Sequence, residues 1–167
     1  MNPAGVAFYD RLINALLAHN ITPWVTLFHW DLPLALQLEG DGLINPEVAD
    51  WFAHYAEVCF ARFGDRVKHW ITLNEPWCSA VLGHGIGYFA PGRTSKSEPY
   101  LAAHHLIRAH GRIVDVYRRK FQTAQRGVIG ITNNCDWREP KTNTPADRAA
   151  AQRGLEFFLG WFADPIY

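Results

Sequence analysis

Three short apolar runs, separated by long segments with helical periodicity, constrain the fold of this 167-residue chain more than any other feature. Each run is rich in β-branched and aromatic residues, which favours buried strands. The predicted strands lie at about 21–28, 67–74 and 128–132. The predicted helices lie at about 3–19, 46–63, 97–121 and 145–161. Because strands that alternate with long helices pair in parallel through right-handed crossovers, we expect an α/β protein with about three parallel strands and four helices.

Capping residues and glycines mark where these elements begin and end. Asn2 and Thr144 are good N-caps, and each is followed by a proline, which suits the first helical position. Asn45 gives the same signal for the second helix, and Gly64 is expected to end that helix. The longer predicted loops lie at 38–43 and 77–97. A loop as long as the second is usually functional or mobile.

Polar residues stand at the carboxyl end of the second predicted strand. Asn74 and Glu75 come directly before Pro76, which cannot donate to a strand ladder and so ends the strand. In α/β folds the carboxyl ends of parallel strands carry the chemistry. An acid beside an amide and the indole of Trp77 suits glycoside cleavage: the acid protonates a glycosidic oxygen, the amide binds a hydroxyl and the indole stacks on a pyranose. The alternative is a strand-end carboxylate that only caps or forms an ion pair.

The first predicted strand ends in a similar group, His29, Trp30 and Asp31. With both strand ends in view, the chain resembles glycoside hydrolase family 1, the β-glucosidase family. The family's third-strand motif is matched by residues 25–33, VTLFHWDLP, and its acid/base motif by residues 72–77, TLNEPW. Further matching stretches lie at 60–67, 83–92, 102–106 and 160–165. The resemblance covers nearly all of the chain, and its motifs are specific.

The resemblance implies only the central portion of a (β/α)8 TIM barrel. A complete barrel needs about 250 residues, so residues 1–167 are expected to form a single incomplete barrel domain that holds strands three to five of the family barrel. The missing strands carry, in the family, a sugar-binding glutamine, a tyrosine, the nucleophilic glutamate of an Ile-Thr-Glu-Asn-Gly motif and a Glu-Trp pair. No Thr-Glu-Asn-Gly occurs in the chain. The retaining mechanism needs two carboxyl groups roughly 5–5.5 Å apart, and only Glu75 is matched here.

The family's roles transfer to five residues. Glu75 is the implied general acid/base, and His29 and Asn74 are implied ligands to sugar hydroxyls. Trp30 and Trp77 are the implied aromatic contacts to substrate, with Trp77 on the aglycone side. Structural alternatives stay open, because a strand-end histidine is often only a hydrogen bonder and a tryptophan is often a buried plug.

Three other carboxylates lie near predicted strand ends, namely Asp31, Asp136 and Glu139. If the chain catalyses alone, one of them must act as base or nucleophile. The alternative for each is a cap or a salt bridge.

Composition excludes several other functions. The 16 basic and 16 acidic residues cancel, which leaves no electrostatic footprint for nucleic acid or an anionic membrane. No signal peptide and no membrane-spanning run are evident. Cys59, Cys78 and Cys135 lack the spacing of a disulfide framework or a zinc site, so a reduced, cytoplasmic location is expected. The tryptophans expected in packing are Trp24, Trp51, Trp70 and Trp161.

The expected function is therefore a β-glucosidase-type glycoside hydrolase that acts on β-linked glucosides or oligosaccharides, with no metal or organic cofactor. The alternatives are a non-catalytic or sugar-binding remnant and one segment of a complemented split enzyme. Three strands from the middle of a barrel leave two open edges, at the strands that start near Ile21 and Val128. We therefore expect a homo-oligomer or a complementing chain.

Overall fold

The computed structural model describes all 167 residues, which form an α/β structure divided into two compact units. Unit 1 comprises residues 1–31, 47–74 and 108–131. Unit 2 comprises residues 32–46, 75–107 and 132–167. The expected α/β class is confirmed, and the chain passes from unit 1 to unit 2 at the Asn74–Glu75 peptide bond.

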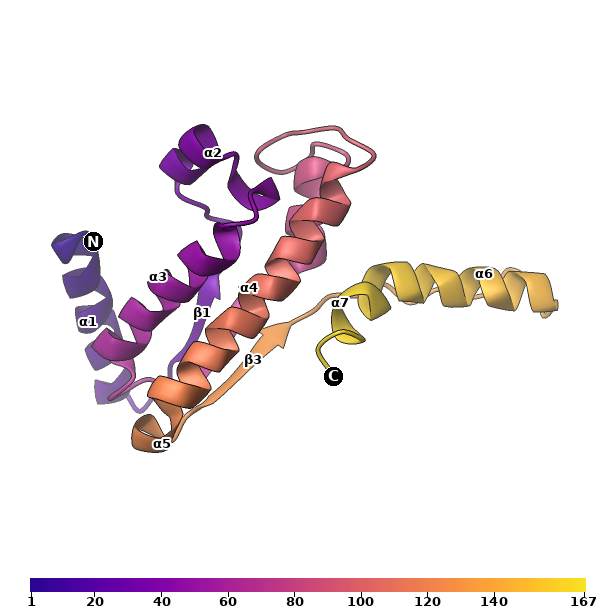
Figure 1. Cartoon of the computed structure of the whole chain (residues 1–167). Coiled ribbons are helices and arrows are strands. Elements are labelled where there is room, and N and C mark those ends of the chain that lie inside the picture. The colour runs from indigo at the N-terminus through magenta and orange to yellow at the C-terminus, as the bar shows by residue number, and fades with distance from the viewer. The chain divides into compact units, whose positions relative to one another are not determined.

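Three strands and four long helices form the frame of the fold (Figure 1). The strands are β1 (Trp24–Phe28), β2 (His69–Asn74) and β3 (Val128–Thr132). The long helices are α1 (Pro3–Ala18), α3 (Val48–Phe63), α4 (Glu98–Lys120) and α6 (Pro145–Leu155). The short helices are α2 (Leu34–Gly40), α5 (Gln122–Gln125) and α7 (Trp161–Ala163). Single turns follow at η1 (Gly42–Ile44), η2 (Cys78–Leu82) and η3 (Glu156–Gly160).

The four predicted helices are confirmed, and the short elements are the part that the pattern missed. The segment 38–43 was expected to be a loop, but α2 and η1 occupy most of it. Asn45 does not cap α3, whose N-cap is Glu47; the Asn45 side chain donates instead to the Gly40 carbonyl at 2.7 Å. Asn2 and Thr144 do cap α1 and α6, accepting from Ala4 N at 3.1 Å and Asp147 N at 3.3 Å.

The sheet has the order β1-β2-β3, with β2 in the centre. β1 and β2 are parallel, and their register sets Trp24 opposite His69 and Phe28 opposite Leu73. The amide of Val128, at the start of β3, donates to the Lys68 carbonyl at 2.8 Å. Parallel order places the carboxyl ends of the strands at one edge of the sheet.

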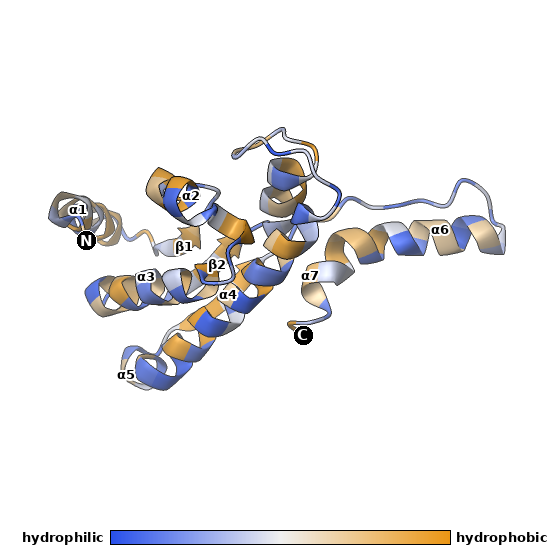
Figure 2. Cartoon of the chain, turned by 45° about the horizontal axis from the view of Figure 1, so that its top comes forward, coloured by the Kyte–Doolittle hydropathy of each residue, from blue (hydrophilic) through white to orange (hydrophobic).

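The core of unit 1 forms where α3 and the later half of α4 cover the sheet. Buried residues recur along α3 at helical spacing, and Figure 2 shows hydrophobic and hydrophilic positions alternating around α3 and α4. Phe60 of α3 lies 4.9 Å from the Trp70 ring and 4.8 Å from the Tyr117 ring, both measured between centroids. Phe52 contacts Phe28 of β1 at 4.9 Å. Burial of these aromatic rings stabilises this unit.

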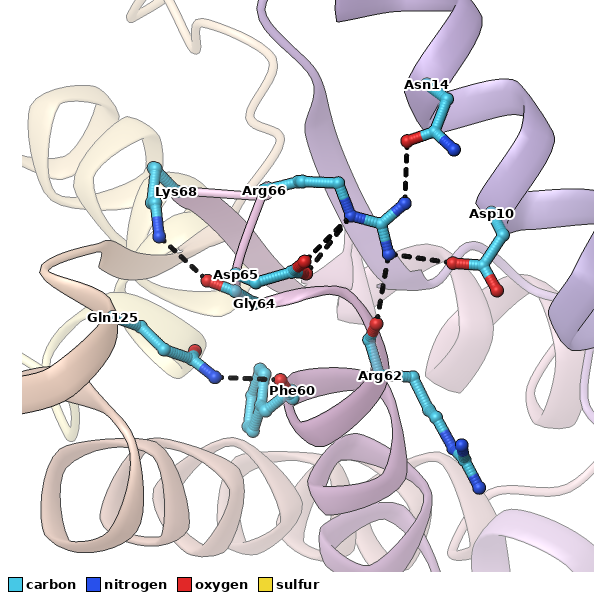
Figure 3. A network of polar contacts seen from close by, with 9 residues as sticks. All are labelled: Asp10, Asn14, Phe60, Arg62, Gly64, Asp65, Arg66, Lys68 and Gln125. Carbon is cyan, nitrogen blue, oxygen red and sulfur yellow. Dashed lines mark hydrogen bonds and ion pairs between the residues drawn. The ribbon is translucent and has the colours of Figure 1, made fainter.

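Arg66, in the turn after α3, ties that turn to α1 (Figure 3). Its guanidinium donates to Asp10 Oδ1 and to Asn14 Oδ1, each at 2.7 Å. It also donates to the Asp65 carboxylate at 3.1 Å and to the Arg62 carbonyl at 3.2 Å. Because Ile13 is the only buried residue of α1, this polar network supplies much of the specific contact that the helix makes.

The edges of the sheet are exposed in unit 1. Trp70 of the central strand is 2% exposed, as expected for packing, but Trp24 of β1 is 64% exposed and stacks on His69 with ring centroids 4.3 Å apart. Val128, at the start of the other edge strand, is 55% exposed. The expectation of a packed Trp24 therefore fails within this chain, because Trp24 lies on the edge strand β1 with little cover.

Aromatic stacks also organise unit 2. Trp77 stacks on Phe158 of η3, and Tyr100 of α4 lies 5.1 Å from the ring of Trp161. His105 Nδ1 lies 3.0 Å from the carbonyl of Leu43 in η1, which ties η1 to α4. Across both units, no helix has the length and apolar character needed to cross a membrane.

Candidate active site

The end of β1 positions three of the predicted site residues. His29 follows Phe28 directly and is exposed, and its ring meets the Trp30 ring edge-on with centroids 5.0 Å apart. The His29 amide donates to Asp31 Oδ1 at 3.2 Å, so this carboxylate closes a short local turn. Asp31 therefore has a structural partner in its own loop.

Trp30 joins the ends of β1 and β2. Its backbone lies in the left-handed region, with φ +76°, and its indole Nε1 donates to the Asn74 carbonyl at 2.9 Å. The structure thus brings His29, Trp30 and Asn74 together within unit 1. Asn74 is half-buried, and the indole contact holds its backbone while its side-chain amide hydrogen-bonds to no protein group.

Glu75 sits where the chain turns from β2 into the helical turn that Pro76 begins. Its φ is +46°, a left-handed conformation that costs a non-glycine residue roughly 1 kcal/mol. Two backbone hydrogen bonds offset that cost. The Glu75 amide donates to the Thr132 carbonyl at 2.8 Å, and the Glu75 carbonyl accepts from Cys78 N at 2.9 Å. The sharp turn follows from Pro76, which has no amide to continue the ladder.

The carboxyl group of Glu75 contacts one side chain, that of Cys78. The thiol donates to Glu75 Oε2 with 3.4 Å between sulfur and oxygen, and Asn134 Nδ2 donates to the same sulfur at 3.4 Å. Burial raises the pKa of Cys78 to about 11, and the hydrogen bond to Glu75 adds to the rise. The thiol is therefore protonated at neutral pH and acts as the donor.

Trp77 packs face to face on Phe158, with centroids 4.0 Å apart and planes 13° from parallel. The guanidinium of Arg138 covers Phe158, 5.7 Å from the ring centroid. Within unit 2, Trp77 is therefore half-buried in an aromatic stack. Its assignment to the substrate stays a prediction, and the stack agrees with the packing alternative.

The two remaining carboxylates lie on the loop after β3. Glu139 Oε2 accepts from the indole of the exposed Trp137 at 2.6 Å. Asp136 pairs with Arg138 at 3.9 Å, and its charge contributes to the raised pKa of Cys78. Both carboxylates are exposed. Their contacts are a surface ion pair and a surface hydrogen bond, which agrees with the alternative that these residues are structural rather than catalytic.

A hollow of about 520 Å³ lies in unit 2, but Glu75 and Trp77 do not line it. Trp137, Glu156 and Asp164 are among its lining residues. No group of histidine, cysteine, aspartate or glutamate side chains is arranged to hold a metal ion.

Sequence reasoning missed Cys78, Asn134 and Phe158. Cys78 carried a detectable signal, because it lies three residues after Glu75 at the start of a helical turn, where side chains meet. Asn134 and Phe158 carried none, because only the fold brings Asn134 to Cys78 and Phe158 to Trp77.

Parallel strands flanked by helices, with an amide at the last residue of β2 and a carboxyl and indoles just beyond the strand ends, define an α/β protein that gathers polar groups at the carboxyl ends of its strands. The family model for glycosyl hydrolase family 1 matches residues 1–167. The chain belongs to this family.

Similar proteins share its sequence over the whole chain. β-Glucosidase 42 of Arabidopsis thaliana is 52% identical over 169 residues, which is 100% of this chain and 34% of that protein. β-Glucosidase 1B of Phanerodontia chrysosporium is 49% identical over 178 residues, covering 100% of this chain and 33% of that protein. The chain thus spans about a third of the length of the relatives that it matches.

Solved structures agree. A rice β-glucosidase matches with a TM-score of 0.98 and 49% identity, covering 100% of this chain and 37% of that chain. A β-glucosidase from the fungus Humicola insolens, solved in complex with glucose, matches with a TM-score of 0.96 and 45% identity, again with 37% of that chain covered.

Proposed function

We propose that this chain carries the acid/base part of a retaining β-glucosidase-type hydrolase that acts on β-linked glucosides. Family membership and the names of the relatives support the reaction class. The observation that carries the proposal is Glu75 itself. It lies directly after a parallel strand in the family's acid/base motif, with one carboxyl oxygen held by Cys78 and no protein hydrogen-bond donor on the other.

The chemistry assigns Glu75 two tasks. As an acid it protonates the leaving glycosidic oxygen, and as a base it takes a proton from the water that completes hydrolysis. His29 and Asn74 bind sugar hydroxyls in this proposal. Trp30 holds the backbone of Asn74, which orients the strand end that carries both the amide and the acid.

A second carboxylate is required, because a retaining enzyme forms a covalent glycosyl intermediate. Asp31, Asp136 and Glu139 each have a protein partner. We therefore propose that β1–β3 are the third to fifth barrel strands, and that the nucleophile comes from a complementing segment or a second copy. Because these three carboxylates already contact protein groups, they also favour one alternative, a non-catalytic remnant that has an acid and no nucleophile.

Hydrolysis of an aryl β-glucoside by the purified chain tests the form of the proposal in which a second copy supplies the nucleophile. We expect turnover that Glu75→Gln abolishes and that Glu39→Gln leaves unchanged. Glu39 is an exposed residue of α2 and makes none of the recorded hydrogen bonds or ion pairs, so it is a matched control. Equal activity in Glu75→Gln and in the unmodified chain would indicate a contaminating enzyme and contradict the proposal.

A further inference from the structure

Cys78 forms the centre of a short hydrogen-bonded chain in unit 2. Asn134 Nδ2 donates to Cys78 Sγ, and the thiol donates to Glu75 Oε2, with 3.4 Å at both steps. The backbones of the same two residues are also hydrogen-bonded: the Cys78 amide donates to the Glu75 carbonyl at 2.9 Å. The acid is therefore held by its main chain and by its side chain through the same residue.

The donor and acceptor of each hydrogen bond in this series follow from the groups available. An amide N–H can only donate, so it occupies a lone pair of the sulfur and leaves the single S–H hydrogen for Oε2. Cys78 is 6% exposed, and burial holds the thiol in its protonated form at neutral pH. A buried protonated thiol is a poor nucleophile, so this residue is suited to hydrogen bonding rather than to its own chemistry.

We propose that Cys78 is a positioning residue for Glu75: its thiol fixes Oε2 and leaves Oε1 for proton transfer to and from substrate. A glutamate side chain on a left-handed backbone at a turn has several rotamers, and ordering it before substrate arrives lowers the entropic part of the barrier. The catalytic consequence rests on the proposed function, whereas the hydrogen bond itself does not.

The S–H stretching band in the infrared tests the contact without any need for activity. The Cys59→Ala/Cys135→Ser background leaves Cys78 as the only thiol. We expect its band at a lower wavenumber than that of a free thiol, and we expect Glu75→Ala to move it upward. Glu75→Asp, which withdraws the carboxyl by one methylene, should move it in the same direction and serves if Glu75→Ala fails to fold. Glu39→Ala should leave it in place. A band that neither Glu75 variant moves would overturn the proposal.

Kinetics then test the positioning role. With an aryl β-glucoside, Cys78→Ala should lower kcat about fivefold with little change in KM, because ordering of the acid acts on the chemical step. Cys78→Ser keeps a donor and should recover most of the loss. A kcat that Cys78→Ala leaves unchanged, or an equal loss in both variants, would overturn the role. An unmodified chain that hydrolyses nothing, with a band that responds to Glu75→Ala, would instead overturn the supply of the nucleophile by a second copy and keep the contact.

Discussion

At the scale of single residues, the Glu75 carboxyl group is hydrogen-bonded by Cys78. The three other carboxylates near strand ends, Asp31, Asp136 and Glu139, each contact another group of the protein. If the chain is active without a partner, one of Asp31, Asp136 and Glu139 must supply the second carboxylate, because these three lie on strand-end loops. In a chain that is active as a monomer, one amide variant among Asp31→Asn, Asp136→Asn and Glu139→Gln should lower kcat by at least about a hundredfold, whereas a nucleophile from elsewhere leaves all three at the unmodified rate. Steady-state kinetics on each variant measure this. Three variants at wild-type rates would mean that another chain supplies the nucleophile.

His110 gives a second prediction at this scale. It is 8% exposed in α4, and its Nδ1 lies 2.8 Å from Thr72 Oγ1, whose hydroxyl donates to the Gly130 carbonyl at 3.2 Å. Burial, followed by the charge of Arg118, lowers the pKa of His110 from its ordinary 6.5 to about 4. Between about pH 6.5 and pH 4, His110 is therefore protonated in the unfolded chain and neutral in the folded chain.

The sign of the pH dependence follows from that pKa. The lowered pKa of His110 makes a contribution to the free energy of unfolding that is fully present above about pH 6.5. This contribution is lost as the pH falls toward 4, by an amount on the order of 3 kcal/mol. Urea unfolding at several pH values should show this loss, and His110→Gln should reduce it. His84, whose pKa burial also lowers, adds a loss of the same sign that the variant does not remove. An identical pH profile for His110→Gln would contradict the assignment.

At the scale of elements, α1 depends on Arg66. Arg66→Met removes the charge-assisted hydrogen bonds to Asp10 and Asn14 (Figure 3). Because α1 buries only Ile13, we expect the free energy of unfolding to fall by about 1–2 kcal/mol, with faster amide exchange confined to α1. Arg119→Met removes an exposed ion pair to Asp115 within α4 and is the control, with an expected change under about 0.5 kcal/mol. Equal losses in the two variants would show that the Arg66 network has no special weight.

The elements also show how far sequence reasoning reaches. The third strand was predicted with its observed bounds, and Asn2 and Thr144 cap their helices, because apolar runs and caps are local signals. The helix α2 was missed because Pro33 at its start makes no side-chain cap hydrogen bond. The exposure of Trp24 was missed because burial depends on neighbours that a local pattern does not contain.

In the candidate site, too, the features with local sequence signals could be predicted and the features that depend on long-range contacts could not. Pro76 marked the end of β2, so Asn74 and Glu75 were placed at a strand end from sequence alone. The contact between Glu75 and Cys78 carried a local signal in its spacing of three residues. The hydrogen bonds from the Glu75 amide to Thr132 and from Asn134 to Cys78 could not be predicted, because these partners lie far along the sequence. The substrate roles of His29, Trp30, Asn74 and Trp77 stay predictions.

At the scale of the whole molecule, the exposed apolar surface of unit 1 predicts association. Both edge strands carry exposed apolar residues, and α1 exposes Phe8, Tyr9, Leu12 and Leu17. Surfaces of this kind mark contact sites. We expect light scattering at micromolar concentration to give a mass above the 19.0 kDa of one chain, and Trp24→Lys to shift it toward the monomer. A monodisperse monomer with cooperative unfolding would contradict this expectation.

The central claim, that Glu75 is the general acid/base of a retaining hydrolase, is tested most directly by chemical rescue. The measurement is turnover of an activated aryl β-glucoside by Glu75→Ala with and without azide, with Glu39→Ala as control. Without Glu75 no base takes a proton from the water of the second step, so we predict that Glu75→Ala is nearly inactive alone. Azide is already an anion, so it can attack the glycosyl intermediate and displace the nucleophilic carboxylate without a base. Added azide should restore part of the turnover and release a β-glucosyl azide. Full turnover by Glu75→Ala without azide would contradict the claim.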